Sequence, residues 1–159
     1  MSNISTIKLK PLIISLILSL GTGFLSSLLT KNSREVYANL IKPDLAPPAI
    51  VFPIVWTILF ILMGISAYIV YESNSPYKEY SLKLYIVQLI VNFFWSIIFF
   101  NLNQFTFAFI WILVLIVLVS FMIFNFYKIN KCAAYLQIPY LLWLIFAVYL
   151  NYNIILLNI

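Results

Sequence analysis

Histidine is absent from this chain of 159 residues, and cysteine occurs only once, at Cys132. A single cysteine cannot form a disulfide within the chain. The absence of histidine excludes Ser-His-Asp triads and, together with the lone cysteine, the usual zinc sites. We therefore predict no bound metal and no obligatory cofactor.

Acidic residues number only four, and all of them fall in polar connections between apolar stretches. Acid–base catalysis needs positioned titratable groups, and proton pumps and ion channels normally carry an ionisable group inside the membrane. The three glycines form neither a phosphate-binding loop nor a dinucleotide fingerprint. These absences argue against conventional acid–base enzymes and charge-driven transporters. The four acidic residues are Glu35, Asp44, Glu72 and Glu79.

Apolar residues, in contrast, dominate the chain: 65% are hydrophobic and 8% are charged, which leaves too little polar surface for a soluble globule. Five continuous apolar stretches are each about 20 residues long, enough for a helix to cross a hydrocarbon core of about 30 Å. Continuous runs favour helices over a barrel. The predicted fold is an all-α integral membrane protein, a bundle of five transmembrane helices that form a single domain. The predicted spans are residues 11–29, 50–71, 82–101, 105–127 and 133–157.

The first stretch has a second interpretation, because Lys8 and Lys10 precede it as the basic region of a cleaved signal peptide would. The stretch is longer than a usual signal core, and no Ala-x-Ala-like site follows it, so we favour a span. Small residues recur every four positions along it, which predicts a ridge that packs against a neighbouring helix. The ridge consists of Ser15, Ser19, Gly23 and Ser27.

The nine Lys and Arg residues give a formal net charge of +5 but form no contiguous patch, so nucleic acid is not a predicted partner. With five spans, six of the nine fall on the side of the N-terminus and three on the side of the first loop. This count favours a cytoplasmic N-terminus. The six are Lys8, Lys10, Lys78, Lys83, Lys128 and Lys131, and the three are Lys31, Arg34 and Lys42.

Aromatic and polar side chains follow helical spacing on three spans, which places each set on one helix face. Amides cost free energy in hydrocarbon unless they are paired, so Gln88 and Asn92 are expected to face the bundle. The sets are Trp56, Phe60, Met63 and Ala67 in the second span, Tyr85, Gln88, Asn92, Trp95 and Phe99 in the third, and Tyr140, Trp143, Ala147 and Asn151 in the fifth.

Two interpretations of these stripes remain open. The amides can bond one helix to another, and the aromatic residues can form an interfacial belt. Alternatively, the stripes line a pocket for a flat, apolar ligand with a few polar atoms. Trp111 has only aliphatic neighbours and fits the belt, whereas Trp56, Trp95 and Trp143 share a face with polar or small residues and favour the pocket.

The first loop, residues 30–49, is predicted to be a rigid lid. Asn32 and Glu35 have the spacing of a capping box, which predicts a short helix. Prolines after this helix fix φ and hold the preceding residues extended, although they could also simply end one helix and start another. The short helix would present an apolar face of Val36, Tyr37, Leu40 and Ile41, and the prolines are Pro43, Pro47 and Pro48.

The segment "VYANLIKPDLAPPAIVFPIVWTILFILMG" resembles the signature Trp-Tyr-x-x-Leu-x-Lys-Pro-x-Trp-x-Pro-Pro, with a Trp eight residues later, of the translocator protein and tryptophan-rich sensory protein family, the peripheral-type benzodiazepine receptors. The likeness continues in "YIVQLIVNFFWSIIFF" and "IPYLLWLIFAVYLNY". Val36 and Leu45 depart from it, since the family usually has tryptophans there. Leu156 replaces the basic residue of the cholesterol-recognition pattern of animal members, so sterol binding through that pattern is not expected.

The resemblance implies a five-helix bundle, usually dimeric, in a membrane that we expect to be a bacterial cell membrane. It also implies a pocket under the first loop that binds protoporphyrin IX and related flat ligands, as in a receptor or sensor. Two alternatives are light-dependent porphyrin degradation by Trp56 and Trp143, and transport of porphyrin or other hydrophobic molecules. The candidate ligand-binding residues from the family pattern are Tyr37, Pro47, Trp56, Asn92, Trp143 and Ala147, and the stripes add Gln88, Trp95 and Tyr140.

A metal-free porphyrin is the expected ligand. The chain has no histidine, and Cys132 is expected near a membrane boundary, so there is no obvious axial ligand for a haem iron. The predicted partners are therefore membrane lipid, a porphyrin or similar molecule, and a second copy of the chain.

Overall fold

The structure is a computed structural model and describes residues 6–158. Five of its helical stretches are long and apolar enough to cross a membrane, and a short helix lies in the first loop. This confirms the predicted all-α membrane bundle. In chain order the elements are α1 (Leu9–Leu29), α2 (Ser33–Asn39), α3 (Val51–Glu72), α4 (Lys78–Ser96), the π-helix η1 (Ile97–Asn101), α5 (Phe105–Ile129), α6 (Lys131–Leu136) and α7 (Ile138–Leu157).

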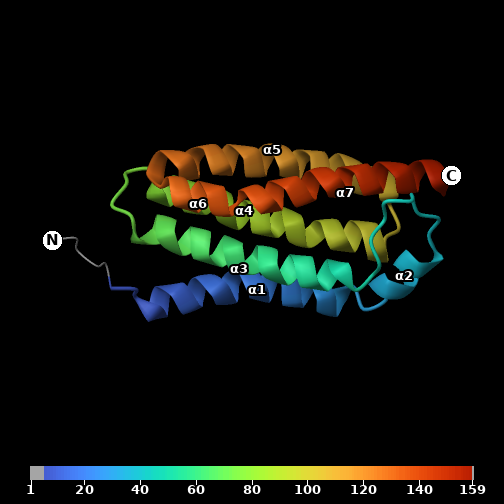
Figure 1. Cartoon of the computed structure of the whole chain (residues 1–159), viewed down its shortest axis with the longest axis horizontal. Coiled ribbons are helices and arrows are strands. Elements are labelled where there is room, and N and C mark those ends of the chain that lie inside the picture. The colour runs from blue at the N-terminus through green and yellow to red at the C-terminus, as the bar shows by residue number, and fades with distance from the viewer. Residues whose placement is uncertain (1–5, 159) are drawn as a thin grey trace.

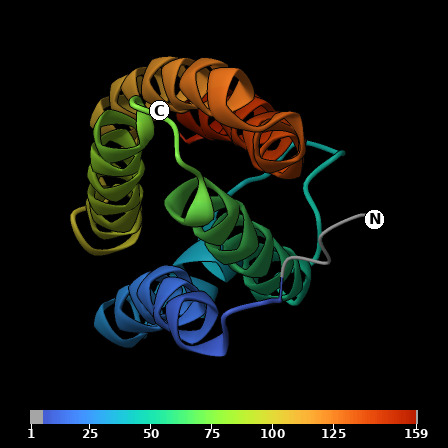
Figure 2. The ribbon, with the colours of Figure 1, turned by 90° about the vertical axis from the view of Figure 1, so that its left-hand side faces the viewer.

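The long helices run side by side, with α2 and its loop at one end of the bundle (Figure 1). The α3–α4 and α5–α6 connections lie at the opposite end (Figure 1). Viewed along the bundle, α1 lies at the edge, next to α3 (Figure 2). The lid thus covers the end of the bundle where α1 and η1 finish and α3 begins.

Most helix boundaries lie within two residues of the predicted spans, and two larger departures have local reasons. The third long helix starts at Lys78, four residues earlier than predicted, and its first turns carry an i,i+4 ion pair between Glu79 and Lys83 at 2.9 Å. The last stretch is interrupted at Gln137, whose N–H donates to the Ala134 carbonyl oxygen at 3.0 Å. Pro139, in the first turn of α7, has no N–H to continue the α6 hydrogen-bond ladder.

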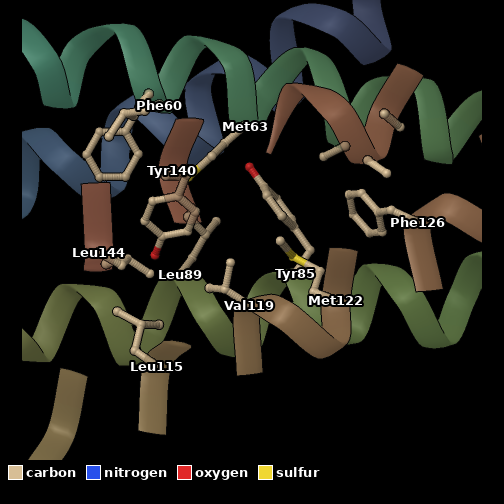
Figure 3. Packing of buried hydrophobic residues seen from close by; sticks show 14 of the residues in the cluster. Phe60, Met63, Tyr85, Leu89, Leu115, Val119, Met122, Phe126, Tyr140 and Leu144 are labelled. Carbon is tan, nitrogen blue, oxygen red and sulfur yellow. The ribbon is translucent and has the colours of Figure 1, made fainter. Parts of the chain in front are cut away.

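The buried core lies between α3, α4, α5 and α7 (Figure 3). Met63, Val119 and Met122 are fully enclosed in it. Many aliphatic side chains point outward instead, and these face lipid in a bundle of this kind, where an exposed apolar side chain carries no penalty.

Small residues join α1 to α3, as the ridge predicts. The Ser15 hydroxyl donates to the Gly64 carbonyl oxygen at 2.6 Å, and Ser19 is fully buried. A Cβ on Gly64 would lie 2.8 Å from the Ser19 Oγ, and one on Gly23 would lie 2.5 Å from the ring of Phe60. The packing role is therefore confirmed for Ser15, Ser19 and Gly23, whereas Ser27 is exposed. Larger side chains at Gly23 or Gly64 would press on the facing helix.

Candidate binding cavity under the first loop

A cavity of about 530 Å³ lies at the α2 end of the bundle. Its wall combines the C-terminal half of α1, part of α2, the first half of α3, the end of α4 with η1, and the middle of α7. The lid, which connects α1 to α3, lies at this end of the bundle. The wall contains many aromatic rings. Six of the aromatic residues come from α3, α4, η1 and α7: Phe52, Trp56, Phe60, Trp95, Phe100 and Trp143.

Three of the four tryptophans line this cavity, and neighbouring rings hold each of them. Trp56 stacks on Phe60 with ring centroids 5.5 Å apart. Trp143 meets Phe52 edge to face at 5.9 Å, and Trp95 stacks on Phe99 at 5.1 Å. Offset-stacked and edge-to-face pairs are the favoured aromatic geometries, so the indoles are fixed before any ligand arrives.

Trp111 lies outside the cavity wall, in agreement with its different sequence context. Its indole N–H donates to the Val91 carbonyl oxygen at 2.8 Å and so bonds α5 to α4. This helix-to-helix bond was not predicted, since Trp111 was assigned to an interfacial belt.

The two amides of the third span meet Tyr140 from α7. The Asn92 amide donates to the Tyr140 hydroxyl oxygen at 2.7 Å, and that hydroxyl donates to the Gln88 Oε1 at 2.9 Å. All three side chains are buried, but only Asn92 reaches the cavity wall. The network therefore bonds α4 to α7, and Asn92 is its one member that faces the ligand space.

Tyr37 anchors the lid over the cavity. Its hydroxyl donates to the Pro47 carbonyl oxygen at 2.7 Å, and its ring meets Phe52 edge to face at 5.1 Å. Burial raises the pKa of the Tyr37 phenol, so the hydroxyl remains a hydrogen-bond donor at neutral pH. The Lys42 ammonium donates to the carbonyl oxygens of Tyr37 and Leu40, each at 2.8 Å, and thereby closes the end of α2.

A second fastening joins the lid to the end of α7. The Ile41 N–H donates to the Asn158 Oδ1 at 2.9 Å, and the Asn158 amide donates back to the Ile41 carbonyl oxygen at 2.8 Å. In Figure 1 the loop after α2 approaches the C-terminal end of α7. The lid is therefore tied down at two points, by side chains as well as by its prolines.

The predicted capping box was wrong. Asn32 precedes α2, but its side chain accepts no hydrogen bond from this helix. Its backbone angles of φ −86° and ψ 6° continue the turn that begins at Thr30, whose carbonyl oxygen accepts from the Ser33 N–H at 3.0 Å. A capping residue needs an extended backbone to aim its side chain at the first turn. The predicted apolar face was also partly wrong, because the Ile41 side chain is 60% exposed.

Residues 14–157 match the TspO/MBR family. The chain belongs to that family. It is 36% identical over 144 residues to the tryptophan-rich protein TspO of Chlorobaculum tepidum, an alignment that covers 89% of the chain and 91% of the relative. It is 38% identical over 149 residues to the tryptophan-rich protein TspO of Archaeoglobus fulgidus, covering 92% and 96%. The human translocator protein is 35% identical over 119 residues, covering 73% of the chain and 70% of that protein.

The predicted site residues of this TspO/MBR protein occupy three kinds of position. Pro47 holds the lid through its carbonyl oxygen, and Gln88 and Tyr140 lie behind Asn92. The departures from the family signature leave the wall intact, since Val36 and Leu45 do not line it. The predicted residues that line the cavity are Tyr37, Trp56, Asn92, Trp95, Trp143 and Ala147.

The contribution of α1 to this site was not predicted from the sequence. Gly23 and Ser27 were assigned to helix packing, and both line the cavity, with Gly23 also touching Phe60. Their small side chains were a sequence signal for this role. Beyond the close contact of α1 with Gly64, small residues on α1 leave room for a cavity between the helices. Phe52 was also missed, although it lies four residues before Trp56 and extends the same face of α3; the predicted stripe began only at Trp56.

Proposed function

We propose that this membrane protein is a receptor or sensor that binds a flat apolar ligand, with metal-free protoporphyrin IX as the leading candidate. The observation that carries the proposal is the cavity under α2, where Trp56, Trp95 and Trp143 surround a space of about 530 Å³. Small-molecule sites are typically about 300–1,000 Å³, mostly apolar, with a few placed polar groups. A porphyrin macrocycle can stack on the indoles while Asn92 bonds a polar atom.

The fastened lid favours binding over continuous passage. Tyr37 and Pro47 close the loop on itself, and Asn158 ties it to α7. A transporter must open its site to both membrane faces in turn, whereas a receptor needs only a stable bound state. Transport of porphyrin or another hydrophobic molecule remains the alternative, and a liposome assay without protein-dependent porphyrin movement would remove it.

The distribution of basic residues supports an orientation. The six lysines assigned to the N-terminal side belong to the ends of α1, α4, α5 and α6 that lie opposite α2. With the excess of basic residues on the cytoplasmic face, the N-terminus is cytoplasmic and the cavity lies toward the outer face of a bacterial cell membrane. A homodimer stays a prediction from the family resemblance.

Removing the amide of Asn92 should weaken porphyrin binding. We expect Asn92→Ala to raise the Kd for protoporphyrin IX about tenfold, because one hydrogen bond in an apolar site contributes about 1–1.5 kcal/mol. The measurement is a dark titration of the protein in lipid nanodiscs, followed by quenching of tryptophan emission. Asn125→Ala is the matched control, since Asn125 is a buried amide of α5 that bonds the Phe121 carbonyl of its own helix. Absence of saturable binding by the wild type would refute the proposal.

Light-dependent porphyrin degradation is a second candidate function, which the placement of Trp56 and Trp143 in one cavity wall favours. An indole beside an excited macrocycle, with dissolved oxygen as the oxidant, could take part in such a reaction. We expect Trp143→Phe to bind porphyrin in the dark but to lose the protein-dependent bleaching of its absorption band under illumination. Equal bleaching by a variant without tryptophan would eliminate this function and leave the receptor.

A further inference from the structure

The charge of the cavity wall comes from one residue. Among residues 6–158, Arg34 is the only charged residue that lines the cavity, and no Asp or Glu lines it. Arg34 is exposed near the start of α2 and forms no salt bridge within the same described range. The neighbouring acid Glu35 does not line the cavity. The wall therefore carries an unopposed positive charge at its α1–α2 side.

Hydroxyl groups gather beside this charge. Four of the six Ser and Thr residues in the wall lie within residues 26–33, directly before Arg34. The aromatic rings lie mainly on the other helices, as described above. The cavity thus has an aromatic side and a polar, cationic side. The four residues are Ser26, Ser27, Thr30 and Ser33.

We propose that the cavity selects flat aromatic anions, with the ring against the tryptophans and a carboxylate against Arg34. This inference rests on the proposed function and specifies the ligand class for the same cavity. A guanidinium binds a carboxylate through two parallel N–H···O bonds, which a neutral ring system cannot accept in the same way. The hydroxyls of Ser26, Ser27 and Ser33 supply further donors for the same group, whereas the Thr30 hydroxyl already donates to the Ser26 carbonyl oxygen at 2.8 Å. A neutral sterol or hydrocarbon would leave this side of the wall unused.

Protoporphyrin IX and its dimethyl ester provide the test, because they share one macrocycle and differ in their two carboxylates. Each is titrated in the dark into wild-type protein, Arg34→Gln and Lys31→Gln in neutral-lipid nanodiscs, with empty nanodiscs subtracted. Lys31 is the matched control, since it is an exposed cation three residues away that does not line the cavity.

We expect Arg34→Gln to weaken binding of the diacid about fivefold, a modest factor because Arg34 is exposed and water screens its charge. Binding of the ester should not change in Arg34→Gln, and Lys31→Gln should change neither ligand. Added salt should weaken only the diacid.

The inference is overturned if Arg34→Gln and Lys31→Gln have the same effect, or if the ester and the diacid respond equally to Arg34→Gln. In those cases saturable binding of both porphyrins would leave the proposed function standing. If the wild type binds neither porphyrin saturably, both the proposed function and this inference fail.

Discussion

Replacing Ala147 with Phe should abolish porphyrin binding and leave the bundle folded. Ala147 lies on α7, one turn beyond Trp143, and lines both the main cavity and an adjoining space of about 30 Å³ that Trp95 also borders. A phenyl ring at this junction would occupy the space where a macrocycle would approach the indoles. We expect the Kd for protoporphyrin IX to rise at least about a hundredfold.

A dark titration in nanodiscs measures this effect, and thermal unfolding of the same samples reports on the fold. Filling a cavity is usually neutral or stabilising, so the Phe variant should unfold at or above the wild-type temperature. Ala147→Ser is the matched control because it keeps a small side chain and should bind normally. Wild-type affinity in a folded Ala147→Phe protein would place the ligand site elsewhere.

Replacing Gly64 with Val should separate α1 from α3. The Cβ alone would lie 2.8 Å from the Ser19 Oγ, 2.9 Å from the Leu16 Cδ2 and 3.1 Å from the Leu16 Cα. The last atom is backbone and cannot move away by a rotamer change. The shift would also stretch the bond from the Ser15 hydroxyl to the Gly64 carbonyl oxygen. We expect the free energy of unfolding to fall by about 2–3 kcal/mol, as overpacking does in other cores.

Unfolding in mixed detergent micelles measures that loss. Gly21→Val is the matched control, because a Cβ at Gly21 meets nothing within 4 Å. The same substitution should therefore change stability little at Gly21. Porphyrin binding should weaken in the Gly64 variant as well, since Gly23 and Ser27 of α1 form part of the cavity wall. Equal losses of stability in the two variants would contradict the close packing of α1 on α3.

The membrane spans were predictable because they depend on composition and length, which neighbouring helices do not alter. The third-span stripe was predictable for a related reason. An amide such as Gln88 must find a partner away from lipid, and Tyr140 on α7 provides it. Sequence spacing could not say which amide would also reach the cavity, because that depends on how α4 and α7 are rotated against each other. Asn92 reaches it, and Gln88, one turn away, does not.

Features that depend on distant residues could not be predicted from local pattern. Asn158 holds the lid through Ile41, which is 117 positions away in the sequence. Arg34 was counted only toward membrane orientation, and the structure places it in the cavity wall. No sequence pattern predicted the π-helix at residues 97–101. Its Asn101 amide donates to the Leu29 carbonyl oxygen at 2.9 Å and so fixes the end of α1. These contacts arise only after the helices have packed.

A structure of the protein with protoporphyrin IX bound in the dark would show whether the cavity under the first loop holds the ligand. We expect one macrocycle beneath α2, in contact with Trp56, Trp95 and Trp143, with a carboxylate near Arg34. A macrocycle ordered only on the lipid-facing surface, with the cavity empty at saturating porphyrin, would show that the cavity is not the ligand site.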